Sequence, residues 1–480
     1  MPTVSLPDDP DLGQLRKQAK DVQRALRAGA PEPLALAAEL GAPADARLST
    51  AQLVVARMYG FPSWPALVRR VGVIAEHRRY PDRVEPSDDP ATEFLRRACL
   101  TYGPSDSVRG AVPVPPDADV WVAAACADVE ALERLLAADP GRATRLGGPH
   151  RWSPITYLAY ARHDPTLTAD AVLDAVQVLL RYGADPDSGY LWHGLTTPFT
   201  LLTGAFGGGE QGQPAHPQVA VLARALLEAG ADPNDGQTLY NRMFRPADDH
   251  LELLFEFGLG TGDGGPWRRR LGDATDSPET MLRKQLGWAV THGFTRRVAL
   301  LAEHGVDLVA PLPGWGAMRG STPYEAAVTS GQLAVAQQLV ELGVAAPALD
   351  PADQVLSAVL AADGTAVDRL GTEALAAARA RRPGLVVWAA VQGSAAAVRM
   401  AVELGWDVSA KARTDTPGTD EWETALHHAA GNGDVAMTEL LLELGADPTV
   451  RDHRFDATPR GWAEHFDQPS TAALLPPDVR

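Results

Sequence analysis

The 480-residue sequence contains few of the residues that cross-link a protein or anchor it in a membrane. It has two cysteines, Cys99 and Cys126, both in largely apolar, helical contexts. Two cysteines without a histidine cluster make neither a disulfide framework nor a zinc site. No uncharged apolar run approaches the length that crosses a bilayer, and the N-terminus lacks the apolar core of a signal peptide. We therefore expect a cytoplasmic protein with both thiols reduced.

Basic residues are outnumbered by acidic ones. The net charge is −18, which argues against a nucleic-acid backbone or an anionic membrane as the main partner. The short basic clusters at 268–270 and 381–382 are expected to be solvated turns. Almost all basic residues are arginine, and alanine, glycine and proline are abundant, which indicates a GC-rich bacterial genome.

Motifs typical of enzymes do not stand out. There is no Gly-x-Ser-x-Gly or His-Glu-x-x-His pattern. The Gly-Gly-Gly-Glu run at 207–210 lacks the Lys-Ser/Thr and the preceding strand of a phosphate-binding loop, so a flexible insertion between helices is expected. His427 and His428 are adjacent, and neighbours on a helix do not face each other, so they do not readily chelate one ion. The sequence predicts no catalytic residue, no metal site and no cofactor.

An internal repeat is the dominant feature that the sequence does contain. Four stretches share a small residue, a glycine four positions later, a glutamate ten positions after that, and a second glycine. They are residues 286–310, 324–348, 386–410 and 426–450. Each predicts two short helices joined by a turn. Because helices this short cannot bury an apolar face alone, neighbouring units must stack.

The fourth stretch shows the expected local structure. Thr424 suits the N-cap of a first helix over about 425–430, since its hydroxyl can accept from a free N–H of the first turn. A second helix should begin after Asp434 and end at Gly445, because glycine tolerates the left-handed backbone that closes a helix.

These residues resemble the ankyrin repeat. The run TALHHAA at 424–430 is similar to the helix-one signature Thr-Pro-Leu-His-x-Ala-Ala, and Gly-Ala-Asp-Pro turns recur at 183–186, 230–233 and 445–448. The resemblance covers about three quarters of the chain and implies about ten units. It also implies that His427 fixes a turn by local hydrogen bonds. The N-terminal pattern is similar to that of bacterial, often actinobacterial, ankyrin-repeat proteins.

The predicted fold is all-α: a curved, elongated ankyrin-repeat solenoid of stacked helix–turn–helix units. Residues 1–86 are expected to form an N-terminal helical segment with a divergent, repeat-like helix pair. Residues 87–480 are expected to form the repeat array, irregular and inserted at 151–270 and regular at 282–475.

The block 151–270 departs most from the repeat pattern and holds nearly half of the aromatic residues. These side chains either fill wider gaps between enlarged repeats or form a contact surface, because Tyr, Trp and Arg are favoured at interface hot spots. Insertions in repeat proteins also tend to lie on the binding face. The candidate partner-binding residues are Trp152, Tyr157, Tyr160, Tyr190, Trp192, His193, Tyr240, Asn241, Arg242 and Trp267.

The predicted function is a non-enzymatic interaction scaffold or adaptor, monomeric, that holds a protein partner in the concave groove formed by the turns and the helix-one faces. The alternative is an enzyme or a small-molecule-binding protein with its pocket in the 151–270 block, where Tyr157, Trp192, His193, Tyr240 and Asn241 are the candidates. A deep pocket closed by residues 187–217 would favour the alternative, and an open groove would favour the adaptor.

Overall fold

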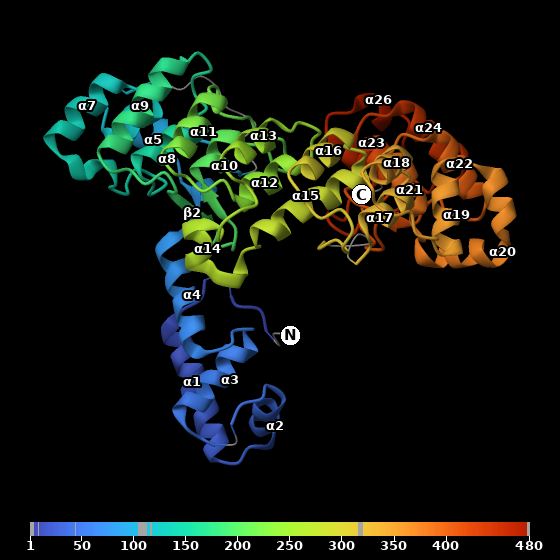
Figure 1. The fold of residues 1–480 in the computed structure, drawn as a ribbon, viewed down its shortest axis with the longest axis horizontal. Helices are drawn as coiled ribbons and strands as arrows, with labels where there is room; N and C mark the ends of the chain where they lie inside the picture. Colours follow the sequence, from blue (N-terminus) through green and yellow to red (C-terminus); the bar gives the residue numbers. More distant parts are fainter. Residues whose placement is uncertain are drawn as a thin grey trace. The chain divides into compact units, whose positions relative to one another are not determined.

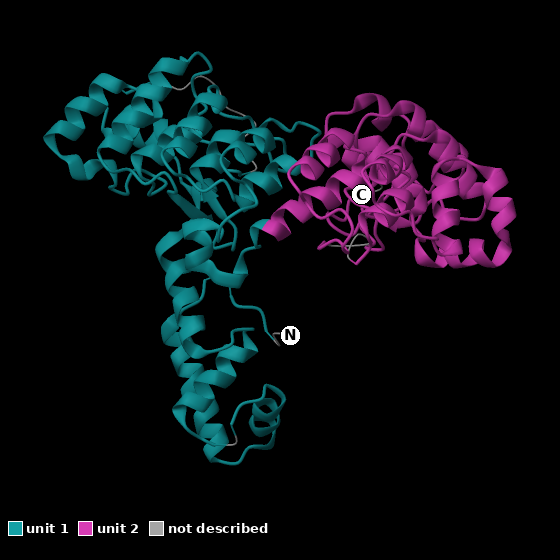
Figure 2. Cartoon of the chain, viewed as in Figure 1, with its two compact units in different colours: residues 1–278 teal, residues 279–480 magenta. Residues whose placement is uncertain are grey.

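The computed structural model describes residues 4–7, 9–43, 45–103, 113–115, 118–314 and 320–477. They are mostly helical and form two compact units, residues 1–278 and residues 279–480 (Figure 1, Figure 2). The division lies close to residue 282, where the regular repeats were predicted to begin. The boundary predicted at residue 86 remains a prediction. In the described part of the chain, no helix is both long and apolar enough to cross a membrane.

The first unit begins with four helices that share small apolar cores. They are α1 (Leu12–Arg27), α2 (Pro31–Glu39), α3 (Leu48–Met58) and α4 (Trp64–His77). Asp11 starts α1 because its carboxylate accepts from the Gln14 N–H at 2.6 Å. One face of α1 then packs Leu15 against α3 and α4. The first helix of the predicted N-terminal helical segment is therefore buried on one side.

Helix pairs follow in the rest of the first unit. After α5 (Pro90–Ala98) come α6 (Val120–Ala125) with α7 (Val129–Ala138), α8 (Pro154–Tyr160) with α9 (Ala169–Arg181), α10 (Leu201–Phe206) with α11 (Val219–Glu228), α12 (Gly236–Met243) with α13 (Asp249–Glu256), and α14 (Gly265–Leu271). Single 3-10 turns lie at Pro81–Arg83, Pro140–Ala143 and Gly272–Ala274.

The second unit consists of six further helix pairs in the described residues. They are α15 (Pro278–His292) with α16 (Thr295–Glu303), α17 (Pro323–Thr329) with α18 (Leu333–Glu341), α19 (Pro351–Leu360) with α20 (Gly364–Arg381), α21 (Leu385–Val391) with α22 (Ala395–Glu403), α23 (Ala425–Gly431) with α24 (Val435–Glu443), and α25 (Pro459–His465) with α26 (Pro469–Ala472). Helix α20 is interrupted at Gly371, which has non-helical backbone angles.

The pair α23–α24 shows why these sequences fold as they do. Thr424 caps α23 in a reciprocal pair with His427, whose Nδ1 lies 2.8 Å from the Thr424 hydroxyl. The His427 Nε2–H donates to the Ala457 carbonyl, just before the next helix pair, at 3.0 Å. Burial lowers the pKa of His427, so the neutral ring is the structural form. The helix-one histidine therefore holds a turn, as the resemblance implies.

A small three-stranded sheet adds to the helices. Strand β2 (Gly189–Trp192) pairs antiparallel with β3 (Pro198–Thr200) and parallel with β1 (Arg78–Arg79). Leu191 packs with apolar side chains of α4 and α14, so these elements share one core (Figure 1). Residues 78–79, which directly follow α4, thus provide an edge strand. A shorter pair joins β4 (Lys411–Ala412) and β5 (Glu423–Thr424).

The glycine that ends α24 should carry a conformational cost when it is replaced. Gly445 has φ +91°, and a β-carbon there would meet nothing within 4 Å. Gly445→Ala should therefore lose about 1 kcal/mol of unfolding free energy from backbone strain alone. Urea denaturation followed by circular dichroism measures the loss.

Gly287→Ala is the matched control in the same unit. Gly287 lies inside α15 with ordinary helical angles, and its added β-carbon would meet Leu312 at 3.7 Å, an ordinary contact distance. This variant should be as stable as the original chain or more stable, since alanine favours a helix. Equal midpoints for the two variants would contradict the left-handed assignment of Gly445.

Candidate functional site in the central block

Half of the predicted contact residues form an aromatic core in the central block. The buried side chains are Trp152, Tyr157, Tyr160, Tyr190 and Trp267. Trp152 stacks on Tyr190 with ring centroids 5.1 Å apart and contacts Tyr160 at 5.0 Å. These five rings are at most 6% exposed and pack inside the unit, which favours a structural role over contact with a protein partner. They fill the wider gaps between enlarged repeats.

Two of the three tyrosine hydroxyl groups in this core bond to the backbone. Tyr157 donates to the Gly147 carbonyl at 2.9 Å and accepts from the His150 N–H at 3.1 Å. Tyr160 donates to the Thr200 carbonyl at 2.8 Å. Burial raises the pKa of both phenols. A buried tyrosine bonded in this way fixes the loops around it, so the core positions the hairpin of β2 and β3.

Three other predicted residues come together in an open cleft of about 430 Å³, which we name the Trp192–Tyr240 cleft. Trp192 lies at the end of β2, and Tyr240 and Asn241 lie on α12. The remaining lining residues were not among the predicted contact residues, although Gly208, Gly209 and Glu210 belong to the predicted insertion: Tyr102, Leu195, Thr197, Phe199, Gly208, Gly209, Glu210, Gln211, Gln213 and Gln237. Most of them lie in loops, whose spatial neighbours no periodic pattern reveals.

One wall of the cleft is the half-buried ring of Trp192. Its indole N–H donates to the Thr101 carbonyl at 2.9 Å, and the ring stacks on His193 at 4.0 Å. His193 adopts a left-handed backbone (φ 51°), and its Nε2 lies 2.6 Å from an Asp82 carboxylate oxygen. His193 therefore supports Trp192 from the side and does not line the cleft.

The opposite wall is α12. Asp235 starts this helix by accepting from the Thr238 N–H at 2.8 Å. The Tyr240 hydroxyl donates to Glu210 at 2.7 Å, and Asn241 Oδ1 accepts from Gln237 at 2.8 Å. The Asn241 Nδ2 is buried and has no acceptor in the described part of the chain. A lining residue of the cleft thus has a buried donor without an acceptor.

The glycine run forms the floor of the cleft instead of a phosphate-binding loop. Gly208 pairs with Gln213 in both directions, at 2.8 and 3.0 Å, and the Gly209 N–H donates to the Asn241 carbonyl at 2.7 Å. A β-carbon on Gly208 would lie 2.5 Å from that carbonyl oxygen. The insertion that the sequence predicts to be flexible is therefore a hairpin packed against α12. Arg242, on the same helix, pairs with Asp249 at 2.6 Å and lies outside the lining.

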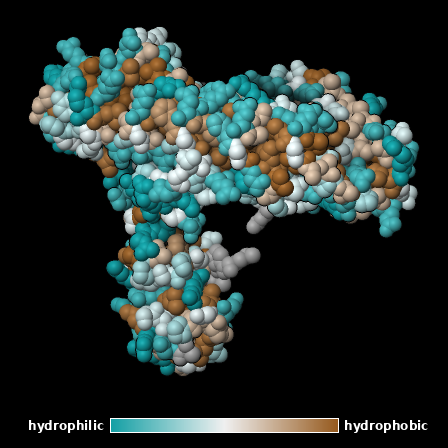
Figure 3. Space-filling view, viewed as in Figure 1, coloured by the Kyte–Doolittle hydropathy of each residue, from teal (hydrophilic) through white to brown (hydrophobic). Residues whose placement is uncertain are grey.

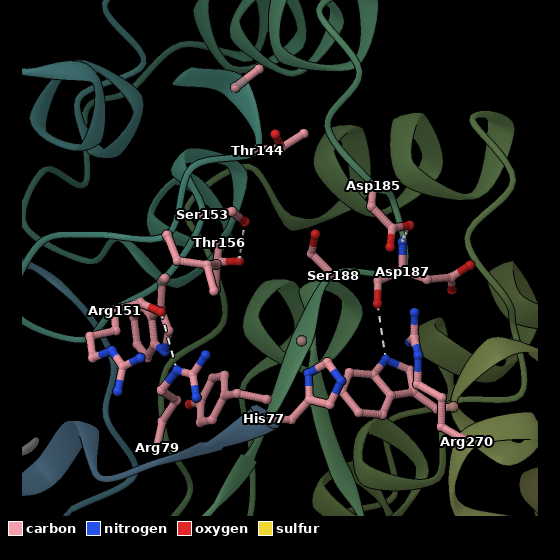
Figure 4. Close-up of a pocket in the computed structure, with 16 residues that line it drawn as sticks. His77, Arg79, Thr144, Arg151, Ser153, Thr156, Asp185, Asp187, Ser188 and Arg270 are labelled. Atoms are coloured by element: carbon pink, nitrogen blue, oxygen red, sulfur yellow. Dashed lines mark hydrogen bonds between the residues drawn. The ribbon is translucent and has the colours of Figure 1, made fainter. Parts of the chain in front are cut away.

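A second, smaller cavity of about 250 Å³ lies in the same unit (Figure 4). We name it the Arg79–Trp152 cavity. Trp152, Tyr190 and Trp267 contribute to its lining, whereas Tyr157 and Tyr160 line neither cavity. Within the described residues, no three His, Cys, Asp or Glu side chains are arranged to hold a metal ion.

Comparison with known families identifies one part of the chain. A family model of ankyrin repeats in many copies matches residues 386–442, the range of α21 to α24. The chain carries ankyrin repeats. Ankyrin repeats generally mediate protein–protein interaction, and the family is typically non-enzymatic. A search of curated proteins finds no match. The matched helices have the capped turn and glycine stops that the sequence predicts for the ankyrin unit.

Tyr160 and Tyr240 should respond differently to loss of their hydroxyl groups. Tyr160→Phe leaves the buried Thr200 carbonyl without its donor and should cost about 1 to 2 kcal/mol of unfolding free energy. Tyr240→Phe removes a bond to the exposed Glu210 and should change stability by less than about 0.5 kcal/mol. Urea denaturation of both variants tests this contrast, and similar losses would contradict the assignment of core and surface.

His216 should make the first unit sensitive to acid. It is buried next to the glycine hairpin, its Nδ1 accepts from the Gln218 N–H at 3.1 Å, and burial lowers its pKa to about 3. The unfolded chain binds this proton below its ordinary pKa of 6.5 and the folded chain does not. The contribution of His216 to the unfolding free energy is therefore fully present above pH 6.5. It decreases by on the order of a few kcal/mol as the pH falls toward 3.

His216→Gln should flatten this dependence in urea midpoints measured between about pH 7.5 and pH 4. Asp187 titrates in the same range, because burial raises its pKa to about 6, but it is present in both proteins. The difference between the two curves therefore isolates His216. Parallel curves would show that protonation of this ring is not coupled to folding.

Proposed function

We propose that the chain is a non-enzymatic scaffold that binds a segment of another protein, and that the Trp192–Tyr240 cleft is a central contact. The observation that carries this proposal is the composition of the cleft. Two half-buried aromatic rings and the side-chain amides of Gln211, Gln213, Gln237 and Asn241 gather in one open depression. Such a surface matches a peptide, which combines apolar side chains with amide groups.

The two rings supply contact area at low entropic cost. Trp192 is held by its bond to Thr101 and Tyr240 by its bond to Glu210. A ring that is fixed before binding loses little rotamer freedom on contact, so more of the burial energy appears as affinity. Leu195, which is 53% exposed at the edge of the cleft, extends the apolar area.

The side-chain amides of the cleft supply directional hydrogen bonds. The buried Asn241 Nδ2 needs an acceptor, and a backbone carbonyl of a bound segment would provide one. Binding would then replace a costly unsatisfied group with a hydrogen bond. A segment that reaches into the cleft could supply this acceptor, whereas a segment that only covers the cleft could not.

Charge favours a basic partner segment. Glu210 is the acidic residue in the lining, and the chain as a whole carries −18. A net negative field raises the association rate of a positively charged partner. Arginine or lysine in the partner could pair with Glu210. The proposed partner is therefore a protein with a basic segment, not a nucleic acid and not an anionic membrane.

Surface hydrophobicity alone does not select this site. On the face shown in Figure 3, apolar residues form separate patches over both units.

The proposed scaffold is an ankyrin array that includes the helix pairs from α6–α7 to α25–α26, with the partner along the helix-one faces and the turns. Tyr240 and Asn241 lie on such a first helix, which supports this placement. A monomer in the cytoplasm of a bacterium is part of the proposal.

The alternative function is an enzyme or a small-molecule-binding protein. The site that could serve it is the Arg79–Trp152 cavity and not the Trp192–Tyr240 cleft. The Trp192–Tyr240 cleft is open, with Leu195, Glu210 and Gln211 exposed around it. An open cleft favours the adaptor. The Arg79–Trp152 cavity shares none of its lining residues with the cleft, so a small-molecule site there is compatible with a protein-binding scaffold.

A peptide-display library selected on the full chain provides ligands for the test. The double variant Trp192→Ala with Tyr240→Ala should bind the selected peptides more weakly by about 2 kcal/mol or more, measured by isothermal titration calorimetry. Its melting temperature should fall only slightly, because both rings are half-buried. Selected peptides should be enriched in arginine and lysine.

Phe455→Ala is the control, because this ring is 65% exposed and lies in the other unit. It should leave the affinity unchanged. Equal loss of binding in the control, or undiminished binding in the double variant, would rule out the cleft as the contact. A collapse of the melting temperature in the double variant would show that the rings serve folding instead.

A further inference from the structure

The Arg79–Trp152 cavity brings basic side chains together in a chain of strongly negative net charge. Figure 4 shows Arg79, from β1, next to Arg151, from the turn before α8. The two residues touch, since the Arg79 Nε–H donates to the Arg151 carbonyl at 3.2 Å. Arg270 of α14 lines another part of the same cavity. Asp185 and Asp187 also line the cavity near Arg270, so the positive charge gathers at the side of Arg79 and Arg151.

Arg79 is a buried cation whose hydrogen-bond partners are neutral. It is 7% exposed, and its guanidinium donates to the carbonyls of Glu76 at 2.8 Å, Arg78 at 2.7 Å and Arg151. Within the described residues it forms no ion pair with a carboxylate. Burial, with Arg151 nearby, lowers its pKa. Glu76 partly opposes this effect without forming an ion pair. A buried charge without a contacting counter-charge is costly, and an anion in the cavity would reduce that cost.

Arg151 is placed at the cavity by a strained turn. Its backbone is left-handed (φ 54°), in a turn closed by two bonds between Gly147 and Trp152 at 3.0 and 3.1 Å. A residue with a β-carbon in this conformation costs about 1 kcal/mol or more. The Arg151 side chain is exposed and has no ion pair within the described part of the chain. The turn thus places a second cation beside the first against their mutual repulsion.

Further hydrogen-bonding groups line the cavity beside these arginines. The Trp152 ring is 2% exposed, and its buried indole N–H has no acceptor in the described part of the chain. The Ser153 and Thr156 hydroxyls lie 2.9 Å from each other in the same wall. A buried donor without an acceptor is rare in folded proteins and marks a place where a ligand atom would be stabilised.

We propose that the Arg79–Trp152 cavity binds the oxyanion of a small molecule, a carboxylate or a phosphate. The guanidinium groups of Arg79 and Arg151 supply the counter-charge, and the Trp152 indole N–H supplies a directed bond. Charge-assisted bonds of arginine to such oxygens are shorter and stronger than neutral ones. The cavity volume of about 250 Å³ limits the ligand to a small metabolite.

Other groups in the lining restrict which anions fit. Asp185 and Asp187 lie away from the Arg79–Arg151 pair, near Arg270, and His77 lies between (Figure 4). The two aspartates would repel a second negative group at that side and would accept from a hydroxyl or an ammonium of the ligand. The ligand is therefore expected to carry one anionic end and one donor end.

Isothermal titration calorimetry on the full chain tests the proposal with inorganic phosphate and with acetate as probes, at constant ionic strength in chloride. One of the probes should bind a single site with a Kd of about 1 mM or tighter. Binding of phosphate alone identifies a phosphate site, and binding of acetate alone identifies a carboxylate site. No saturable heat with either probe at roughly ten times that concentration overturns the proposal.

Single-residue variants distinguish a specific anion-binding site from nonspecific electrostatic attraction of anions. Arg151→Ala should weaken binding at least tenfold and leave folding intact, because this side chain is exposed. Trp152→Phe removes the indole N–H and should weaken binding several-fold, with its melting temperature recorded to check the core. Arg181→Ala is the control, since Arg181 pairs with Glu133 on the surface and does not line the cavity. Equal affinity in Arg151→Ala, or an equal loss in Arg181→Ala, contradicts the site.

Discussion

Each unit of this protein depends on the burial of helices too short to be stable alone. Helices of six to ten residues, such as α6, α10 and α23, do not persist in water, because nucleation costs more than so few hydrogen bonds return. Their apolar faces are covered by the next helix pair, and a side-chain cap or a glycine closes many of their ends, as at Thr424 and Gly445. His427 shows the coupling between neighbours, since one ring caps its own helix and bonds to the following unit.

In the central block, residues 151–270, larger side chains bury the short helices. Its insertions separate the helix pairs, and Trp152, Tyr160 and Tyr190 fill the resulting space. The insertions are also tied by backbone bonds, between β1 and β2 and between the glycine hairpin and α12. Rigid insertions can hold side chains in fixed positions around a depression. This is the physical basis of both the Trp192–Tyr240 cleft and the Arg79–Trp152 cavity.

The two sites differ in the chemistry they offer. The cleft is open and combines exposed apolar area with amides, which suits an extended segment of a protein. The cavity is small and presents arginine side chains with a buried indole donor, which suits a small anion. Strand β2 contributes to both, since Tyr190 lines the cavity and Trp192 lines the cleft. The two residues are two positions apart in the strand, so they lie on the same face and the two sites use successive positions along it.

The sequence determined the repeat unit by itself, because capping and chain reversal are local. Thr424, Asp434 and the left-handed Gly445 act within a few residues of their own helices, and each has the role that its residue type predicts. Tertiary structure decided which aromatic rings are core and which are surface. Contacts between residues far apart in the chain distinguish Trp152 from Trp192: Trp192 bonds to Thr101, and Trp152 stacks on Tyr190. Burial is a property of the packed chain, and no local pattern records it.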